Sequence, residues 1–259
     1  MRIVTTAVNI PGPVAAARLR DLGAAVTKVE PPSGDPLELA APEWYERLVV
    51  GTEVVRLDLK AESLDGLLPG ADVLLTSQRR GALERLGLAW AEVHERHPGL
   101  AQVAILGEGE RAVHDLTYLA SRGLLDPPHL PRTVMADLIG AERAVSAALA
   151  ALLGGGGSYV EVSLAEVADA LAEPLRAGLT APGGVLGGGL ATYGLYEASD
   201  GWIAVAALEP GFRSRLAEGL GIAELTRPEL ESAFRSRTAA EWEAWARELD
   251  LPVEALHGP

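Results

Sequence analysis

Three titratable residues stand at or just before the start of predicted helices, a placement suited to proton transfer. His114 precedes the helix predicted to begin at Asp115, Asp137 opens a second helix, and Glu209 precedes a third. Histidine and carboxylate side chains are common general acids and bases. The first N–H groups of a helix have no partner within that helix, so they also offer donors to a developing oxyanion. We therefore expect His114 and Asp137 to be candidate acids and bases, with oxyanion donors near Asp115.

Each of these residues also has an ordinary structural explanation. Asp137 would be an N-cap, which stabilises a helix by roughly 0.5–2 kcal/mol. His114 would be a surface or loop histidine, and Glu209 a first-turn acid favoured by the helix dipole. Spacing alone favours the structural explanation for both His114 and Asp137.

Alternating apolar runs and helical patterns predict the elements that carry these residues. Strands are expected at Arg2–Val8, Ala25–Val29, Glu53–Leu57, Ala71–Leu74, Leu100–Leu106 and Ser158–Ser163. Helices are expected near Val14–Leu22, Glu62–Leu67, Gly81–Leu86, Trp90–Arg96, Asp115–Arg122, Asp137–Leu153 and Leu164–Leu179. Such alternation is typical of βαβ units. It predicts the α/β class, with a Rossmann-like large domain built on a mostly parallel sheet.

A glycine-rich segment, Gly183–Gly189, marks the predicted domain boundary. Residues 1–182 would form the large domain and residues 183–259 a small α+β domain. The small domain is expected to hold a hairpin, Tyr193–Glu197 with Trp202–Ala206, and helices near Gly211–Gly219, Pro228–Phe234 and Ala239–Leu249. No GxGxxG follows the first strand, which argues against a dinucleotide site.

Composition narrows the class of protein. The 259 residues include no cysteine, which excludes a disulfide framework and a thiolate nucleophile. A net charge of −14 argues against nucleic acid or an anionic membrane as the main partner. No apolar run approaches the roughly 18–20 residues that span a bilayer, and the first ten residues do not read as a signal peptide. We expect a cytoplasmic protein.

The stretch Gly12–Pro36 contains three distinctive short motifs in order: GP, LGA and KVEPPSGDP. It closely resembles the opening of the family III CoA-transferases (CaiB/BaiF type), which include the α-methylacyl-CoA racemases. ADVLLTSQRRGALERLGL at Ala71–Leu88, RLDLK and HPGLAQVAILGEG resemble further segments of that family. The resemblance extends, with gaps, over most of the chain.

Three segments resemble the racemases in particular. VHDLTYLA at Val113–Ala120 is similar to the segment with the racemase histidine, and MADLIG at Met135–Gly140 to the segment with the family's catalytic aspartate. VAALEPGF is similar to the segment whose glutamate supports the histidine. The resemblance implies that His114, polarised by Glu209, and Asp137 act on opposite faces of C2 of a 2-methylacyl-CoA. It implies no metal, nicotinamide or flavin cofactor, since CoA enters as part of the substrate.

The resemblance also implies the substrate contacts. Arg79 aligns with an arginine that lies near CoA in the family, and Arg56, Asp115 and Tyr118 are expected to join it. The chain departs from the family's pattern at several points. Val49-Val50-Gly51-Thr52-Glu53 replaces a basic segment before DLK, Thr76-Ser77-Gln78 and Arg80 stand in the loop that usually reads ENFRPG, and the loop before His114 is shortened.

The oligomeric state follows from the same resemblance. The family's C-terminal segment helps to interlock two ring-like subunits, and this chain ends at Pro259, about where the small domain ends. An ordinary homodimer is therefore expected instead of an interlocked one.

Two other functions stay open at this point. One is a CoA-transferase in which Asp137 is the nucleophile that forms an aspartyl-CoA thioester. The other is a non-catalytic paralogue that binds an acyl-CoA. His94 and His97 have a spacing that a shared metal ion would accept, but no further ligand pattern accompanies them, so a solvated helix end is the preferred explanation.

Overall fold

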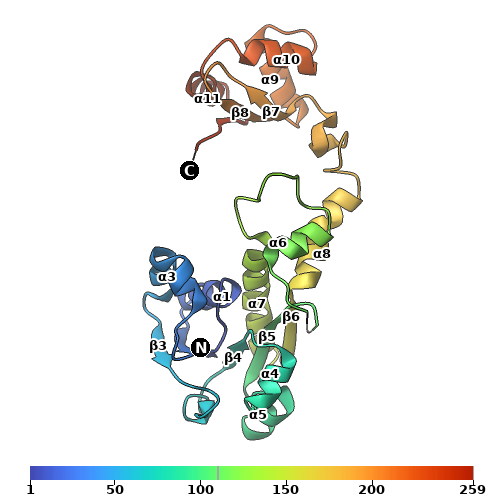
Figure 1. Ribbon diagram of the computed structural model, residues 1–259. Coiled ribbons are helices and arrows are strands. Elements are labelled where there is room, and N and C mark those ends of the chain that lie inside the picture. The colour runs from blue at the N-terminus through green and yellow to red at the C-terminus, as the bar shows by residue number, and fades with distance from the viewer. Residues whose placement is uncertain (110, 259) are drawn as a thin grey trace. The chain divides into compact units, whose positions relative to one another are not determined.

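The computed structural model describes residues 1–109 and 111–258. The chain separates into two compact units, Met1–Ala172 and Glu173–Pro259, each of which is visible in Figure 1. The domain boundary predicted between residues 182 and 183 stays a prediction. Glu110, in the shortened loop before His114, and Pro259, at the chain end, lie outside the described residues.

The first unit is built on a six-stranded sheet with the order β3-β2-β1-β4-β5-β6. Its strands are β1 (Arg2–Thr5), β2 (Ala25–Glu30), β3 (Glu53–Arg56), β4 (Val73–Thr76), β5 (Ala101–Leu106) and β6 (Tyr159–Ser163). All neighbouring strands are parallel. This is the strand order of Rossmann folds, in which ligands bind where the order reverses, beside the first strand. The α/β class and the Rossmann-like parallel sheet predicted from sequence are confirmed.

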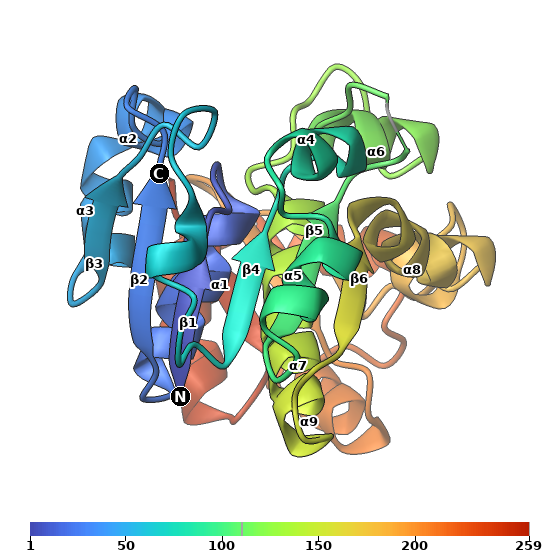
Figure 2. The same ribbon diagram turned by 90° about the horizontal axis from the view of Figure 1, so that it is seen from below.

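Helices cover both faces of this sheet (Figure 2). On one face, α1 (Pro11–Asp21) and α7 (Met135–Leu153) pack on apolar side chains of the strands. On the other, η1 (Leu64–Gly66), α4 (Arg80–Arg85) and α5 (Trp90–Arg96) do the same. Ile3 and Val4 belong to the two different clusters because successive strand residues point to opposite faces.

Small residues allow α1 and α7 to lie close to the sheet and to each other. Ala144 and Ala148 of α7 and Ala15 of α1 are fully buried in one cluster. Gly12 is tighter still, because a Cβ placed on it would lie 2.5 Å from the carbonyl carbon of Ala7. The glycine of the GP pair is thus a packing requirement. Gly23, which follows α1, has φ +92°, as expected for a residue that ends a helix.

Two helices of the first unit were not predicted: α2 (Pro36–Ala40) and α3 (Pro42–Val49). Both begin with proline, which favours the first helical turn. Asp35 caps α2, since its carboxylate accepts the N–H of Leu37 at 2.9 Å. The first unit also contains α6 (Asp115–Ser121). Helix α8 (Leu164–Arg176) begins in the first unit and continues past Ala172 into the second.

The second unit is an antiparallel sheet with helices, which confirms the predicted small α+β fold. Its sheet has the order β7-β8-β9, with β7 (Tyr193–Glu197), β8 (Trp202–Ala206) and the unpredicted β9 (Val253–Ala255). Its helices are η2 (Val185–Gly189), α9 (Pro210–Leu220), α10 (Arg227–Phe234) and α11 (Ala239–Glu248). Phe234 and Trp242 anchor the core, where the indole N–H of Trp242 donates to the carbonyl of Phe234 at 2.6 Å.

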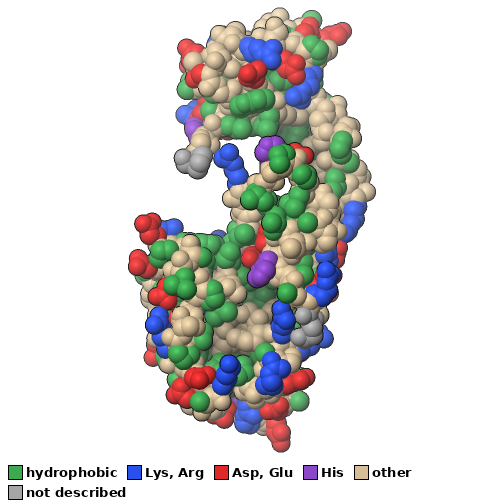
Figure 3. Space-filling model, viewed as in Figure 1, with side chains coloured by type: hydrophobic (Ala, Val, Ile, Leu, Met, Phe, Trp, Pro, Cys, Tyr) green, Lys and Arg blue, Asp and Glu red, His purple; other side chains and the backbone are tan. Residues whose placement is uncertain are grey.

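Charge is distributed without one dominant sign on the face shown in Figure 3. Acidic and basic side chains are interspersed there around α4 and α5, at the lower end of the first unit. Within residues 1–109 and 111–258, no helix is long and apolar enough to cross a membrane.

Candidate active site

A cavity of about 210 Å³ lies at the carboxyl ends of β1, β4 and β5. β1 and β4 are the neighbours between which the strand order reverses, the usual ligand position in this fold. Four predicted site residues line the cavity: Arg79, His114, Tyr118 and Asp137. The remaining lining residues are Val8, Asn9, Pro11, Ser77, Ile105, Gly107, Gly109, Arg111, Val113 and Leu164.

Two hydrogen bonds between the backbone of His114 and the side chain of Thr117 hold His114 at the start of α6. Its N–H donates to the hydroxyl of Thr117 at 2.9 Å, and that hydroxyl donates to the carbonyl of His114 at 2.8 Å. The exposed imidazole therefore lies on the cavity wall at a fixed helix end. Among the described residues, none accepts a hydrogen bond from the N–H of Asp115 or Leu116. These two donors stay open at the same helix start.

Asp137 lies in the first turn of α7, after Met135 and Ala136, while Val134 is the N-cap. The N-cap explanation of Asp137 is therefore wrong: the helix begins two residues earlier than predicted. The N–H of Asp137 donates to Oδ1 of Asp115 at 3.0 Å. Asp115 is buried, and this contact joins the starts of α6 and α7.

The carboxyl group of Asp137 is unusually easy to protonate. Burial, and then the neighbouring charge of Asp115, raise its pKa to about 6, while His114 opposes that rise. Burial favours the neutral acid and a nearby carboxylate repels a second negative charge. A group with such a pKa is ionised at neutral pH and still accepts a proton readily, as a general acid/base must.

Tyr118 places a phenol beside the same cavity. Its ring is buried, and a Cβ on Gly107 would lie 3.0 Å from its hydroxyl. That hydroxyl donates a hydrogen bond to no described residue. Burial, with the charges of Glu108 and Asp137, raises the pKa of Tyr118, so it stays a donor at neutral pH.

Two neighbouring arginines have different surroundings. Arg79 precedes α4, is exposed and lines the cavity, and no described residue forms an ion pair with it. Arg80 instead donates through Nε to Glu161 of β6 at 3.1 Å. Arg80 thus supplies an ion pair between α4 and the edge strand β6.

The structure does not bring every predicted residue to this cavity. Arg56 lies at the end of β3, where it pairs with Glu38 at 3.1 Å and approaches Glu30 at 3.9 Å. Glu209 belongs to the second unit, exposed directly before α9. Its predicted pairing with His114 and the predicted CoA contact of Arg56 stay predictions. Across residues 1–109 and 111–258, no three His, Cys, Asp or Glu side chains gather in a way that could hold a metal ion.

Sequence reasoning missed the turn after β1, which forms part of the cavity wall. The N–H of Val8 donates to Ser77 Oγ at 3.1 Å, and the N–H of Asn9 donates to Asp35 Oδ1 at 3.0 Å. Gln78 adds a bond to the carbonyl of Thr6 at 2.7 Å. The unusual Thr76-Ser77-Gln78 segment therefore ties this turn to β4. The sequence could have indicated these residues only by their position directly after β1 and β4, because the ends of these two strands meet where the strand order reverses.

A second, apolar cavity of about 520 Å³ adjoins the starts of α6 and α7. It is lined by Ile10, Trp44, Asp115, Leu116, Leu130, Pro131, Arg132, Thr133, Val134 and Leu138. Because Asp115 lines it and also bonds to Asp137, the apolar cavity and the polar one are neighbours.

Comparison with known proteins decides the family. The model of CoA-transferase family III matches residues 1–259. This chain belongs to that family. The family III fold is also seen in the solved structure of the Mycobacterium tuberculosis protein Rv3272, with a TM-score of 0.84 and 26% identity, over 100% of this chain and 84% of that one. The family resemblance found in the sequence is confirmed.

Curated family III relatives carry two kinds of activity in their names. The human alpha-methylacyl-CoA racemase is 31% identical over 277 residues, covering 90% of this chain and 70% of the relative. The succinyl-CoA–D-citramalate CoA-transferase of Chloroflexus aurantiacus is 28% identical over 261 residues, covering 87% of this chain and 65% of the relative. The chain is therefore an enzyme-family member similar to racemases and transferases alike.

Proposed function

We propose that this chain catalyses 1,1-proton transfer at C2 of a 2-methylacyl-CoA thioester. The observation that supports this most directly is that His114 and Asp137, from the starts of two helices, line one cavity. Inversion at C2 needs one group to remove a proton and a second to return one on the opposite face. A cavity with two different acid/base groups in its wall suits that requirement.

The proposed reaction conserves protons and electrons. One side chain takes the C2 proton, and the C–H electron pair moves to the thioester carbonyl, giving an enolate. The other side chain then protonates the opposite face of C2. The open N–H groups of Asp115 and Leu116 and the hydroxyl of Tyr118 are the donors that would hold the enolate oxygen. A positioned general acid or base, as proposed for His114 and Asp137, typically raises the reaction rate by about 10²–10⁴-fold.

The rest of the substrate has matching surroundings. Arg79, which pairs with no described acidic residue, offers a cation to the anionic CoA portion, with Arg56 as the predicted second contact. The apolar cavity beside Asp115 suits a hydrocarbon acyl chain. CoA would enter as part of the substrate. A homodimer is the assembly expected from the family resemblance, and the cytoplasm is the compartment expected from the composition.

The test is deuterium exchange at C2 of each pure enantiomer of a 2-methylacyl-CoA in D₂O, followed by NMR. In wild type, both enantiomers should exchange and interconvert. His114→Ala and Asp137→Asn should each abolish interconversion. Each should also keep exchange of only the enantiomer whose C2 proton faces the remaining base. Absence of exchange in wild type across several chain lengths would contradict the proposal.

A CoA-transferase is the second candidate, favoured by the 28% identity to the citramalate transferase. In that reaction the Asp137 carboxylate would attack a thioester and displace CoA. Hydroxylamine would then convert Asp137 to a hydroxamate, detectable by mass analysis of the peptide that contains it. A racemase should show no such product.

A further inference from the structure

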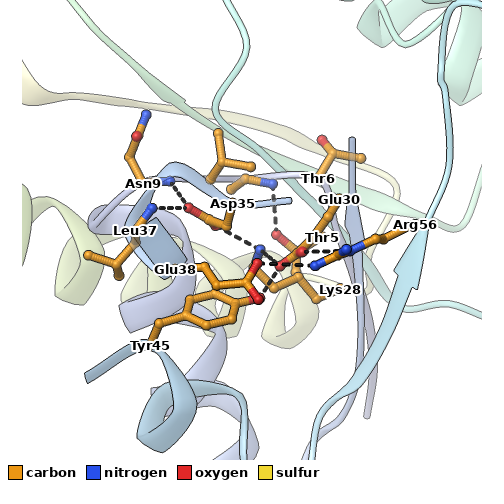
Figure 4. A network of polar contacts seen from close by, with 12 residues as sticks. Thr5, Thr6, Asn9, Lys28, Glu30, Asp35, Leu37, Glu38, Tyr45 and Arg56 are labelled. Carbon is orange, nitrogen blue, oxygen red and sulfur yellow. Dashed lines mark hydrogen bonds and ion pairs between the residues drawn. The ribbon is translucent and has the colours of Figure 1, made fainter. Parts of the chain in front are cut away.

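The motif KVEPPSGDP forms a buried charge network at the end of β2, shown in Figure 4. Lys28 Nζ lies 2.6 Å from Glu30 Oε1 and 2.7 Å from Asp35 Oδ2. All three side chains are at most 1% exposed. The hydroxyl of Tyr45 also donates to Glu30. The Lys, Glu and Asp of this family motif are thus explained by one ammonium group, that of Lys28, shared between the carboxylates of Glu30 and Asp35.

Stability alone is a weak reason for such a network. Removing charges from water costs free energy that their attraction often only offsets, and apolar replacements are frequently as stable. Glu30 Oε2 moreover has no hydrogen-bond partner among the described residues. A role in fixing geometry is the better explanation, and the contacts of Asp35 show which geometry.

Asp35 connects the network to the candidate active site. Its Oδ1 accepts the N–H of Asn9 at 3.0 Å while its Oδ2 stays on Lys28. Asn9 has φ +65°, in the left-handed region that a residue with a side chain seldom adopts, although asparagine tolerates it better than most. Strained residues of this kind persist where their surroundings hold them, and they are frequent at functional sites.

Within residues 1–109 and 111–258, the side-chain amide of Asn9 forms no hydrogen bond, so it can take a ligand as its partner. In Figure 4 it extends away from Lys28 and Asp35, and it lines the cavity shared by His114 and Asp137. Because Ser77 and Asp35 occupy the N–H groups of Val8 and Asn9, this turn has the Asn9 amide to offer a ligand instead of its backbone.

We propose that Asp35 is a positioning residue that, through the N–H of Asn9, holds the turn after β1 so that the Asn9 amide contacts the bound thioester substrate. This inference rests on the proposed function for the identity of the substrate. It adds Asn9 as a substrate contact and assigns the buried motif a purpose in the reaction.

Two matched variants separate positioning from stability. Asp35→Ser keeps a good cap for α2 but removes the carboxylate from Asn9. Glu30→Gln removes the other carboxylate from Lys28 and leaves the bond between Asp35 and Asn9. Each variant leaves Lys28 one carboxylate, so similar falls in melting temperature are expected. Hydrogen exchange should show the Asn9 N–H protected in wild type and Glu30→Gln, and unprotected in Asp35→Ser.

The decisive experiment is a double-mutant cycle with Asn9→Gly, which keeps the turn conformation accessible and removes the amide. Asp35→Ser should lower kcat/KM for C2 exchange by about 10-fold in the wild-type background. In the Asn9→Gly background, Asp35→Ser should lower kcat/KM by less than about 2-fold, because the side-chain amide that Asp35 positions is absent. The melting-temperature changes should add in both backgrounds.

The outcomes distinguish this inference from the proposed function. If wild type exchanges C2 protons but the two rate losses simply add, or Asn9 stays protected in Asp35→Ser, the inference is overturned and the function stands. If wild type shows no exchange but binds a non-reactive thioether analogue of acyl-CoA, the cycle is measured on its Kd. Non-additive losses there support the inference without the function. No exchange and no binding overturn both.

Discussion

The backbone N–H of Asp137 donates to the carboxylate of Asp115 at 3.0 Å, although the two residues lie in the first turns of different helices. The same carboxylate contributes to raising the pKa of the Asp137 side chain to about 6. One buried acid therefore both fixes the position of α7 relative to α6 and tunes the group that we propose as a base. Position and acidity are coupled at this pair, and variants that keep one while changing the other can separate them.

Asp115→Asn should change the acidity of Asp137 and keep its position. The amide oxygen of asparagine still accepts the Asp137 N–H, but the repelling charge is lost, so the pKa of Asp137 should fall toward its ordinary value. Asp137 must be ionised to remove a proton. The acidic limb of the pH–rate profile for C2 exchange should therefore move to lower pH.

Glu142→Gln is the control for that shift. Glu142 is an exposed residue of α7 paired with Arg18 at 2.8 Å, and neither side chain lines the cavity. Its profile should overlay that of wild type. An acidic limb that stays in place in Asp115→Asn would show that the charge of Asp115 does not set the pKa of Asp137.

Asp137→Asn should remove a pH dependence of stability. The folded pKa of about 6 lies above the reference value of 3.8. The stabilisation from this group is therefore complete below the lower value and is lost as pH rises through the higher one. That loss is on the order of 3 kcal/mol at most. Denaturant unfolding at several pH values should find the variant more stable than wild type at neutral pH and similar to it in acid. Lower stability at neutral pH would mean that contacts of the carboxylate outweigh its burial.

The sequence predicted this fold well because the decisive patterns are local. The run Ala101 to Leu106 and the alanine-rich helix that ends at Leu153 each show their element within a short window. Helices α2 and α3 were missed because they are short and hold few buried residues, Leu37 and Tyr45. The boundary of α7 was missed because Val134 lacks a capping side chain, while Asp137, a good cap by type, lies inside the helix.

The candidate site was only partly predictable for a different reason. His114 and Asp137 can be noticed by type and by position before helical patterns. The roles of Asn9 and Ser77 depend on which strands become neighbours, since the bond between Val8 and Ser77 joins residues 69 positions apart. Such contacts follow from the order β2-β1-β4 and not from any local pattern.

Arg79→Gln should weaken binding of CoA esters, while Arg80→Gln should not. Arg79 lines the cavity and, within the described part of the chain, has no ion-pair partner, whereas Arg80 is engaged by Glu161. Loss of one charge-assisted contact should raise KM by about 10-fold with little change in kcat. Steady-state kinetics with one acyl-CoA at two salt concentrations checks this, since the difference between wild type and Arg79→Gln should shrink in high salt. Equal KM values for both variants would remove Arg79 from the substrate contacts.

Gly12→Ala should destabilise the first unit and disturb the turn after β1. The new methyl group would lie 2.5 Å from the carbonyl carbon of Ala7, so either α1 or the backbone at Ala7 must move. Overpacking of this kind costs about 1–3 kcal/mol. Gly66→Ala is the matched control, because a Cβ there meets no atom within 4 Å. Urea unfolding should show a lower midpoint for Gly12→Ala and little change for Gly66→Ala.

Since Ala7 directly precedes the cavity residues Val8 and Asn9, Gly12→Ala should also lose activity at temperatures where it is still folded. Full activity there would mean that the turn tolerates movement of α1.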